Sequence, residues 1–260
     1  VQISTAMMST LFLGALLFCS VISVRSLCES PCSCKLIDKK STASCSNVNL
    51  KTIPRTLDPD SEELDLSHNS LARLPDNVFR DVDLLNLQTV DLHANKISEI
   101  GEDAFRGVTN LRKLDLSDNK LATMRPGTIP RWVLHLNLNG NPLRRLEPNN
   151  FLSSPLLRQL HLERCEIDSI HPNALIEATG LQVISLRNNQ LKNLNETVFK
   201  EQRQLVTLRL EGNPWDCDCS LRRFRDWYYK YDEGTVTCQS PKSLNGTVWK
   251  GLTSFDFVCK

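Results

Sequence analysis

Leucine and asparagine recur along the middle of the chain in a fixed pattern. In residues 111–121, Leu111, Leu114 and Leu116 are followed by Asn119 and Leu121. The asparagine position returns at spacings of 26, 24, 22, 24, 24 and 24 residues, with one cysteine in the series. Repetition at a fixed period predicts one elongated solenoid in place of separate globular domains. The turn positions are Asn69, Asn95, Asn119, Asn141, Cys165, Asn189 and Asn213.

Each repeat predicts one short strand. The two apolar residues of every L-x-L segment should point into the core and the residue between them outward, because side chains alternate between the faces of a strand. Each repeat returns the chain in the same direction, so neighbouring strands should be parallel. An asparagine suits the following turn, since its amide both donates to and accepts from the backbone of a buried bend. The segments are 64–66, 90–92, 114–116, 136–138, 160–162, 184–186 and 208–210.

A second apolar column is expected behind this sheet. Ten residues after most turn positions stands a large apolar side chain on the segment that leads back to the next strand. We interpret these side chains as core, backed by a convex side of irregular loops and 3-10 turns. They are Phe79, Phe105, Ile129, Phe151, Leu175 and Phe199.

Eight of the ten cysteines form two groups, one at each end of the repeats. A solenoid exposes an apolar layer at each end, so both ends need a cap. Four cysteines permit three pairings, and their spacing leaves the pairing within each group open. A zinc site is the alternative for the first group. The groups are Cys28, Cys32, Cys34 and Cys45, and then Cys217, Cys219, Cys238 and Cys259.

The first 26 residues contain a short apolar run that ends in small side chains. This run predicts a secretory signal peptide over residues 1–26, or over 7–26 if translation starts at Met7. No later apolar run has the roughly 20 residues that a membrane span needs. We therefore expect a secreted, extracellular chain in which disulfides persist, or a plasma-membrane ectodomain if the chain is a fragment. Without Arg25, 30 basic and 30 acidic residues remain, and nothing suggests nucleic-acid binding.

The sequence carries no catalytic signature. It lacks an H-E-x-x-H metal site, a G-x-S-x-G nucleophile and a glycine-rich phosphate loop, and its five histidines are scattered. We expect a binding protein and not an enzyme, with no cofactor and no metal. The open face of the sheet is the candidate binding surface. Its candidate residues are Glu63, Asp65, Asp91, His93, Lys113, Asp115, His135, Asn137, Gln159, His161, Glu163, Ser185, Arg187 and Arg209.

The middle positions of the strands change from acidic to basic along the sheet. The first three are Asp65, Asp91 and Asp115, and neighbouring strands lie about 4.8 Å apart, so these carboxylates should repel one another. A basic partner surface would neutralise them. Solvated aspartates in a common repeat position, or a calcium ion, are the alternatives. His135 and His161 should be diagonal neighbours and are candidates for a pH response.

Three further features could take part in function. Tyr228 and Tyr229 fit the expected buried face of a helix in the second cysteine group less well than their neighbours, which makes them candidates for partner contact. Cys165 has no mate after the eight cap cysteines, and its turn position predicts burial as an inert structural thiol. Asn195 and Asn245 begin N-x-T sequons and are expected glycan sites.

Nearly the whole chain after residue 26 resembles extracellular leucine-rich-repeat ectodomains with cysteine-rich caps. The repeats match the L-x-x-L-x-L-x-x-N/C-x-L template, and residues 213–219 read N-P-W-D-C-D-C, which resembles the start of the C-terminal cap of these proteins. Within this group the chain most resembles the insect Kekkon family, through residues 84–88, 104–111 and 213–219. Kekkon proteins continue into an immunoglobulin domain, a membrane span and a cytoplasmic tail.

The resemblance implies an α/β leucine-rich-repeat horseshoe with a short parallel sheet on its concave face and a disulfide cap at each end. The expected parts are a signal peptide (1–26), an N-terminal cap (27–60), about six repeats and a terminal strand (61–212) and a C-terminal cap (213–260). The implied function is binding of an extracellular or cell-surface protein on the concave face. A matrix or adhesive component that binds glycans is the alternative. The implied disulfides are Cys28–Cys34, Cys32–Cys45, Cys217–Cys238 and Cys219–Cys259.

Overall fold

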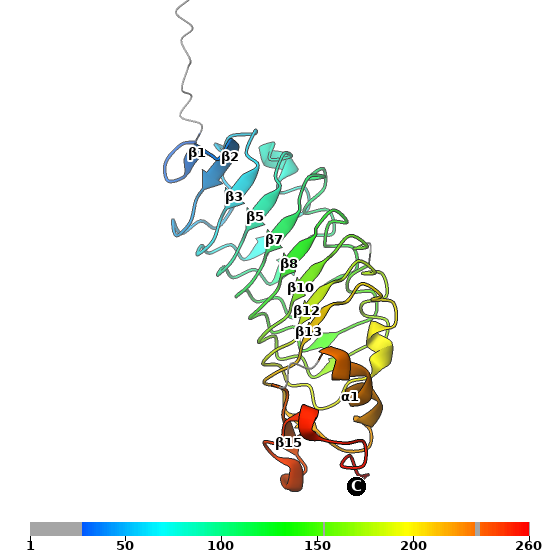
Figure 1. The fold of residues 1–260 in the computed structure, drawn as a ribbon. Coiled ribbons are helices and arrows are strands. Elements are labelled where there is room, and N and C mark those ends of the chain that lie inside the picture. The colour runs from blue at the N-terminus through cyan, green and yellow to red at the C-terminus, as the bar shows by residue number, and fades with distance from the viewer. Residues whose placement is uncertain (1–27, 153, 232–234, 260) are drawn as a thin grey trace, which may run out of the picture.

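The repeats stack into a gently curved solenoid with a sheet along one side (Figure 1). The computed structural model describes residues 28–152, 154–231 and 235–259, so the expected signal peptide lies outside the described residues. The predicted solenoid is confirmed. Its nine-stranded sheet consists, in spatial order, of β1 (Ser33–Ile37), β2 (Lys40–Ser44), β3 (Glu63–Asp65), β5 (Thr89–Asp91), β7 (Lys113–Asp115), β8 (His135–Asn137), β10 (Gln159–His161), β12 (Val183–Ser185) and β13 (Thr207–Arg209).

The repeat strands are parallel, with Leu64, Val90 and Leu114 in register on β3, β5 and β7. Each strand begins and ends one residue earlier than the L-x-L segments suggested. The ladder nevertheless extends past the strand end, because Leu66 donates its N–H to the carbonyl oxygen of Asp91 over 2.8 Å. In the N-terminal cap, β1 and β2 form an antiparallel hairpin, and β2 pairs in parallel with β3. The cap therefore extends the same sheet.

Among the described residues, the regular elements on the side of the solenoid away from this sheet are short. β4 (Arg73–Leu74) pairs with β6 (Glu99–Ile100), and β9 (Arg145–Leu146) pairs with β11 (Ser169–Ile170). The 3-10 helices η1 (Arg80–Val82) and η2 (Glu196–Phe199) lie on the returning segments. The column predicted behind the sheet is buried at all six positions, and the rings of Phe79 and Phe105 stack at 5.1 Å between centroids.

A ladder of asparagine side chains joins consecutive repeats. Asn95 is typical: its Nδ2 donates to the carbonyl oxygens of Leu66 and Leu92 over 2.9 and 3.1 Å, and its Oδ1 accepts from the N–H of Leu71 over 3.0 Å. Each asparagine thus satisfies the backbone of its own repeat and of the one before it. Because these groups are buried, leaving them unpaired would be costly.

Cys165 interrupts the ladder. Its Sγ still donates to the carbonyl oxygen of Leu138 over 3.2 Å, but a thiol cannot reproduce the Oδ1 acceptor. The N–H of Leu143, which an asparagine would bind, donates to the carbonyl oxygen of Asn141 instead. Cys165 is fully buried and forms no disulfide, and burial raises the pKa of its thiol to about 11.

Disulfides close both caps, in the four pairs that the resemblance implies: Cys28–Cys34, Cys32–Cys45, Cys217–Cys238 and Cys219–Cys259. The cysteines of the first group are thus bonded to each other, which rules out the zinc alternative there. The regular elements of the C-terminal cap are β14 (Trp215–Asp216), α1 (Arg222–Tyr228), η3 (Tyr229–Tyr231), β15 (Cys238–Ser240), η4 (Lys242–Leu244) and η5 (Trp249–Gly251).

The prediction that Tyr228 faces a partner is wrong. Tyr228 lies four residues after Phe224 on α1, so the two side chains share one helical face and both are buried. The hydroxyl of Tyr228 donates to the carbonyl oxygen of Leu208 over 3.1 Å and so ties the cap to the last strand of the sheet. Tyr229 is 54% exposed, and its expected contact with a partner stays a prediction.

We expect Asn119→Ala to destabilise the protein by about 3 kcal/mol or more, since it leaves the buried N–H of Ile97 and the carbonyl oxygens of Leu92 and Leu116 without this partner. Urea unfolding measures the change. The exposed Asn110→Ala is the control and should stay within about 0.5 kcal/mol of the native chain. Equal effects of the two substitutions would contradict the role of the ladder.

We expect Cys165 to resist a thiol reagent at pH 8 while the protein is folded, because its thiol is buried and remains protonated. It should react once guanidinium chloride unfolds the chain. Absorbance of the released thiolate measures the reaction, and Cys165→Ala gives the background from any other thiol. Rapid reaction of Cys165 in the native protein would show that the position is accessible.

Candidate binding face

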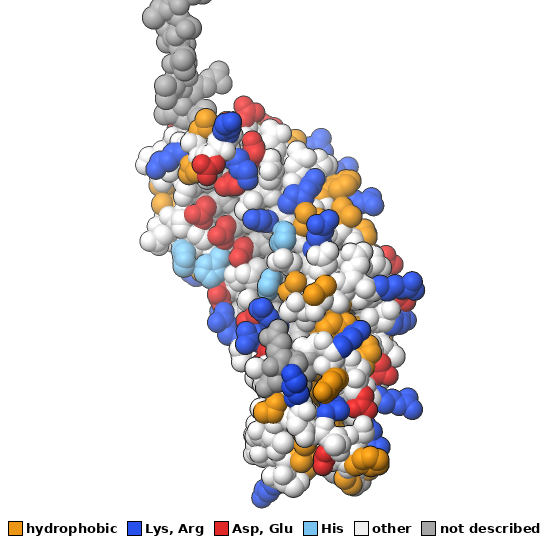
Figure 2. Space-filling view, viewed as in Figure 1, with side chains coloured by type: hydrophobic (Ala, Val, Ile, Leu, Met, Phe, Trp, Pro, Cys, Tyr) orange, Lys and Arg blue, Asp and Glu red, His pale blue; other side chains and the backbone are white. Residues whose placement is uncertain are grey.

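The last residues of the repeat strands form one column across the concave sheet. Strand register places Asp65 beside Asp91, and Asp91 beside Asp115. The column then continues through Asn137, His161, Ser185 and Arg209. Figure 2 shows a row of acidic side chains on the upper half of this face, with histidines on both sides of the row.

Each aspartate of the column closes the turn at the end of its strand. A carboxylate oxygen accepts the backbone N–H two residues later, from Ser67 to Asp65 over 2.9 Å and from Ser117 to Asp115 over 2.8 Å. Asp91 accepts in the same way from His93 over 2.8 Å. These carboxylates are half-buried, so each keeps part of its surface in contact with solvent.

The turn does not require a charge. At the next position of the column, the side-chain oxygen of Asn137 accepts the N–H of Asn139 over 3.1 Å, which is the same local hydrogen bond made by a neutral amide. Three adjacent negative charges therefore exceed what the fold needs. Partial burial raises the pKa of Asp91, and the neighbouring Asp115 and Asp65 raise it further.

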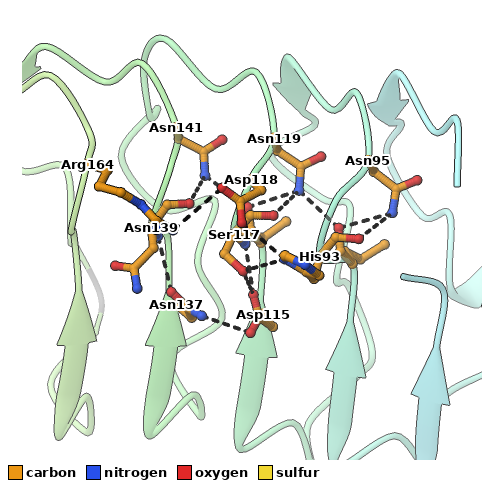
Figure 3. A network of polar contacts seen from close by, with 12 residues as sticks. His93, Asn95, Asp115, Ser117, Asp118, Asn119, Asn137, Asn139, Asn141 and Arg164 are labelled. Carbon is orange, nitrogen blue, oxygen red and sulfur yellow. Dashed lines mark hydrogen bonds and ion pairs between the residues drawn. The ribbon is translucent and has the colours of Figure 1, made fainter. Parts of the chain in front are cut away.

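A polar network borders the acidic column at the strand ends (Figure 3). His93 Nδ1 lies 3.0 Å from the hydroxyl of Ser117 and 3.5 Å from Asp118 Oδ2. The other oxygen of Asp118 lies 3.8 Å from a guanidinium nitrogen of Arg164, two repeats further on. Asn137 also donates to Asp115 Oδ2 over 2.9 Å. The network fixes the side chains on this border across several repeats.

Sequence reasoning missed Asp118 and Arg164 because it considered the strands and their immediate neighbours. Both residues occupy the third position after the end of a strand and have positive φ, at 50° and 55°. A signal was present, since the same position holds glycine at Gly140 and Gly212, and glycine adopts positive φ without strain. The structure shows that this position forms a second column beside the sheet.

A shallow hollow of about 470 Å³ lies on the concave face across β5, β7, β8 and β10. Partial burial lowers the pKa of His161 at its rim, and the nearby Glu163 offsets part of that effect. The candidate residues that the hollow brings together are Asp91, Lys113, Asp115, His135, Asn137, Gln159 and His161.

Three of the other candidates, Ser185, Arg187 and Glu63, are less available to a partner. Ser185 was expected to face outward but is fully buried, because it donates to Glu163 Oε1 over 2.6 Å and that longer side chain covers it. Arg187 pairs with Glu211 over 2.9 Å, and Glu63 pairs with Lys40 over 2.8 Å. Within the described residues, no group of three or more His, Cys, Asp or Glu side chains is arranged to hold a metal ion.

This architecture defines a class, a curved repeat solenoid closed by a disulfide cap at each end. The family model described as "Leucine rich repeat" matches residues 61–121, 85–143 and 155–214, which together exceed half of the chain. The chain belongs to the leucine-rich-repeat family.

The chain is similar to several capped members of the family. It is 27% identical to trophoblast glycoprotein of Macaca fascicularis, over 89% of this chain and 68% of that protein. It is 31% identical to human podocan-like protein 1, over 89% of this chain but only 44% of that protein. The crystal structure of human 5T4 (Wnt-activated inhibitory factor 1, trophoblast glycoprotein) superposes with a TM-score of 0.65 at 26% identity, covering 89% of this chain and 99% of that one.

We expect Asp91→Asn to raise the melting temperature at pH 7 by about 1–3 °C, since asparagine keeps the hydrogen bond from His93 and removes one of three like charges. Folding raises the pKa of Asp91, so its ionised form costs stability above that pKa. The gain should therefore shrink as the pH falls through the folded pKa and vanish below the ordinary value of 3.8.

The exposed Asp81→Asn on η1 is the matched control for Asp91→Asn, because it removes the same charge away from the column. Calorimetric scans between pH 3 and pH 7 measure both variants. A lower melting temperature for Asp91→Asn at pH 7 would show that the carboxylate stabilises the fold after all.

Proposed function

We propose that this chain is an extracellular protein-binding module that takes a protein partner on its concave face. It would act as a receptor or adhesion ectodomain, or as a secreted modulator of cell-surface signalling. The observation that carries the proposal is the row of Asp65, Asp91 and Asp115 beside the hollow, whose charges the fold does not need. Partial burial and the two neighbouring carboxylates raise the pKa of Asp91, so its charge is held at a cost that a basic partner surface would remove.

The expected location rests on the covalent chemistry of the chain. Four disulfides persist only in an oxidising compartment, and the sequon residues Asn195 and Asn245 are both exposed. Asn195 precedes η2 and Asn245 follows η4, so glycans on either residue would leave the concave sheet open. Among the described residues, none of the helices has the length and apolar character required to cross a bilayer.

The relatives support the same class of function without identifying the partner. One similar structure carries the name Wnt-activated inhibitory factor 1, which describes a modulator of signalling. We also propose that the chain is most similar to insect Kekkon ectodomains. We further propose that its caps span residues 27–60 and 213–260, on either side of repeats at 61–212. We propose no catalytic role. His93 lies beside the hydroxyl of Ser117, but that hydroxyl donates to Asp115 and is therefore not held for attack through the imidazole.

An N-linked glycan introduced on the concave face tests the proposal, because it would block access of a partner. Gln159→Asn with His161→Thr creates an N-L-T sequon on β10, and a glycan there should abolish staining of intact cells by the tagged protein. The control is Arg73→Asn with Pro75→Thr, which places a sequon at β4 outside the concave sheet and should leave staining intact.

Enzymatic treatment of the cells separates the two candidate functions. Binding to a protein should disappear after mild trypsin treatment and survive heparinase. The glycan-binding alternative predicts loss of staining after heparinase and needs a basic surface. If heparinase removes the staining while the concave glycan has no effect, the matrix role replaces the proposal.

A further inference from the structure

A second surface lies at the opposite ends of the same strands, where the chain enters β7, β8 and β10. Arg112, Leu134 and Arg158 stand directly before these strands and stack in consecutive repeats. The N–H of Leu134 donates to the carbonyl oxygen of Arg112, and that of Arg158 to Leu134, each over 2.8 Å. Figure 2 shows Lys and Arg side chains interspersed with hydrophobic ones to the right of the acidic row.

Large apolar side chains are exposed beside these arginines. Trp132 is 37% exposed and Leu156 is 45% exposed, and each lies two residues before a member of the stack. The repeat does not demand apolar residues there, because the equivalent positions in other repeats hold Asn86, Asn110, Gly180 and Gln204. We call Arg112, Arg131, Trp132, Leu134, Leu156 and Arg158 the entry edge.

The positive charges of the entry edge have no acidic partner among the described residues. The guanidinium of Arg112 donates only to the carbonyl oxygens of Thr109 and Leu111, over 3.1 and 3.2 Å. Arg131 lies over the ring of Trp132, 5.4 Å from its centroid. Arg158 forms no ion pair with any residue that the structure describes, although ion pairs hold many other arginines of this chain.

The charge is confined to these repeats. Gln88 and Gln182 occupy the stack on either side of Arg112 and Arg158, and both are neutral. The two arginines are separated by two strand spacings, about 10 Å. Lys113 adds a further exposed cation next to Arg112. Apolar contact area and unpaired guanidinium groups therefore coincide on one strip.

We propose that the entry edge binds a segment of a protein partner that carries both carboxylates and apolar side chains. Guanidinium groups bind carboxylates through paired hydrogen bonds, and Trp and Arg are the residues that contribute most often to binding energy at protein interfaces. A sulfated polysaccharide would match the charges, but it has no apolar side chains to cover Trp132, Leu134 and Leu156. The edge adjoins the concave face but contains none of its candidate residues, so this inference does not depend on the proposed function.

Two fluorescent peptides of equal length and charge test the inference, one alternating Glu with Leu and the other alternating Glu with Ser. The Glu-Leu peptide should bind roughly tenfold or more tightly than the Glu-Ser peptide. Arg112→Gln with Arg158→Gln should weaken its binding by a similar factor. Gln88 and Gln182 show that glutamine fits this stack, so the variant should fold, and a melting curve checks it.

Arg80→Gln with Arg223→Gln is the matched control, since both arginines are exposed and lie elsewhere, on η1 and α1. It should bind the Glu-Leu peptide like the native protein, whereas Trp132→Ser should bind it more weakly. Equal affinity for the two peptides, or equal loss in the test and control variants, overturns the inference. So does binding of heparin that depends on Arg112 and Arg158 but not on Trp132, because that result describes a site for polyanions alone.

Discussion

The whole solenoid depends on hydrogen bonding of the buried backbone at the turn after each strand. A strand of three residues must be followed at once by a bend, and the bend lies in the interior, where its N–H and carbonyl groups cannot reach water. The asparagine ladder solves this problem once per repeat. Asn119 binds Ile97 of the preceding repeat through its oxygen and Leu92 and Leu116 through its nitrogen, so the ladder also sets the distance between repeats.

Cys165 shows how far this constraint can be relaxed. The thiol replaces the hydrogen-bond donor of the asparagine but not its acceptor. The N–H of Leu143 therefore donates to the carbonyl oxygen of Asn141 in its own repeat. The neighbouring ladder residue Asn189 still binds the N–H groups of Cys165 and Ile167. One weakened link is tolerated because stacking with both neighbouring repeats holds the backbone in place.

The sequence predicted those parts of the structure that a period alone determines. The strand positions, the parallel register and the buried phenylalanine column follow from the spacing of Leu, Asn and Phe. The prediction that Ser185 is exposed was wrong. The alternation of side chains along a strand predicts only which way Ser185 points, whereas its burial depends on the reach of the neighbouring Glu163 side chain. The interpretation of Tyr228 was wrong because a helix of seven residues offers few positions to choose between two adjacent faces.

The candidate surfaces were harder to predict because they lie across repeats and not along them. Asp118 meets Arg164 only after two repeats have stacked, and Arg112 meets Leu134 and Arg158 in the same way. A column becomes visible in the sequence only when the residues at one position of every repeat are compared, as the middle position of the L-x-L segments was for Asp65, Asp91 and Asp115.

The positions that stabilise the fold and the positions available for binding lie in different columns of the repeats. Positions of the ladder and the core accept few residue types, because each must satisfy a buried backbone or fill a buried volume. The outward positions carry no such demand, as the exchange of aspartate for Asn137 and of arginine for Gln88 and Gln182 shows within this one chain. A charge that recurs in adjacent repeats at an outward position, where a neutral residue would also serve, is therefore better evidence of a binding surface than any feature of the scaffold.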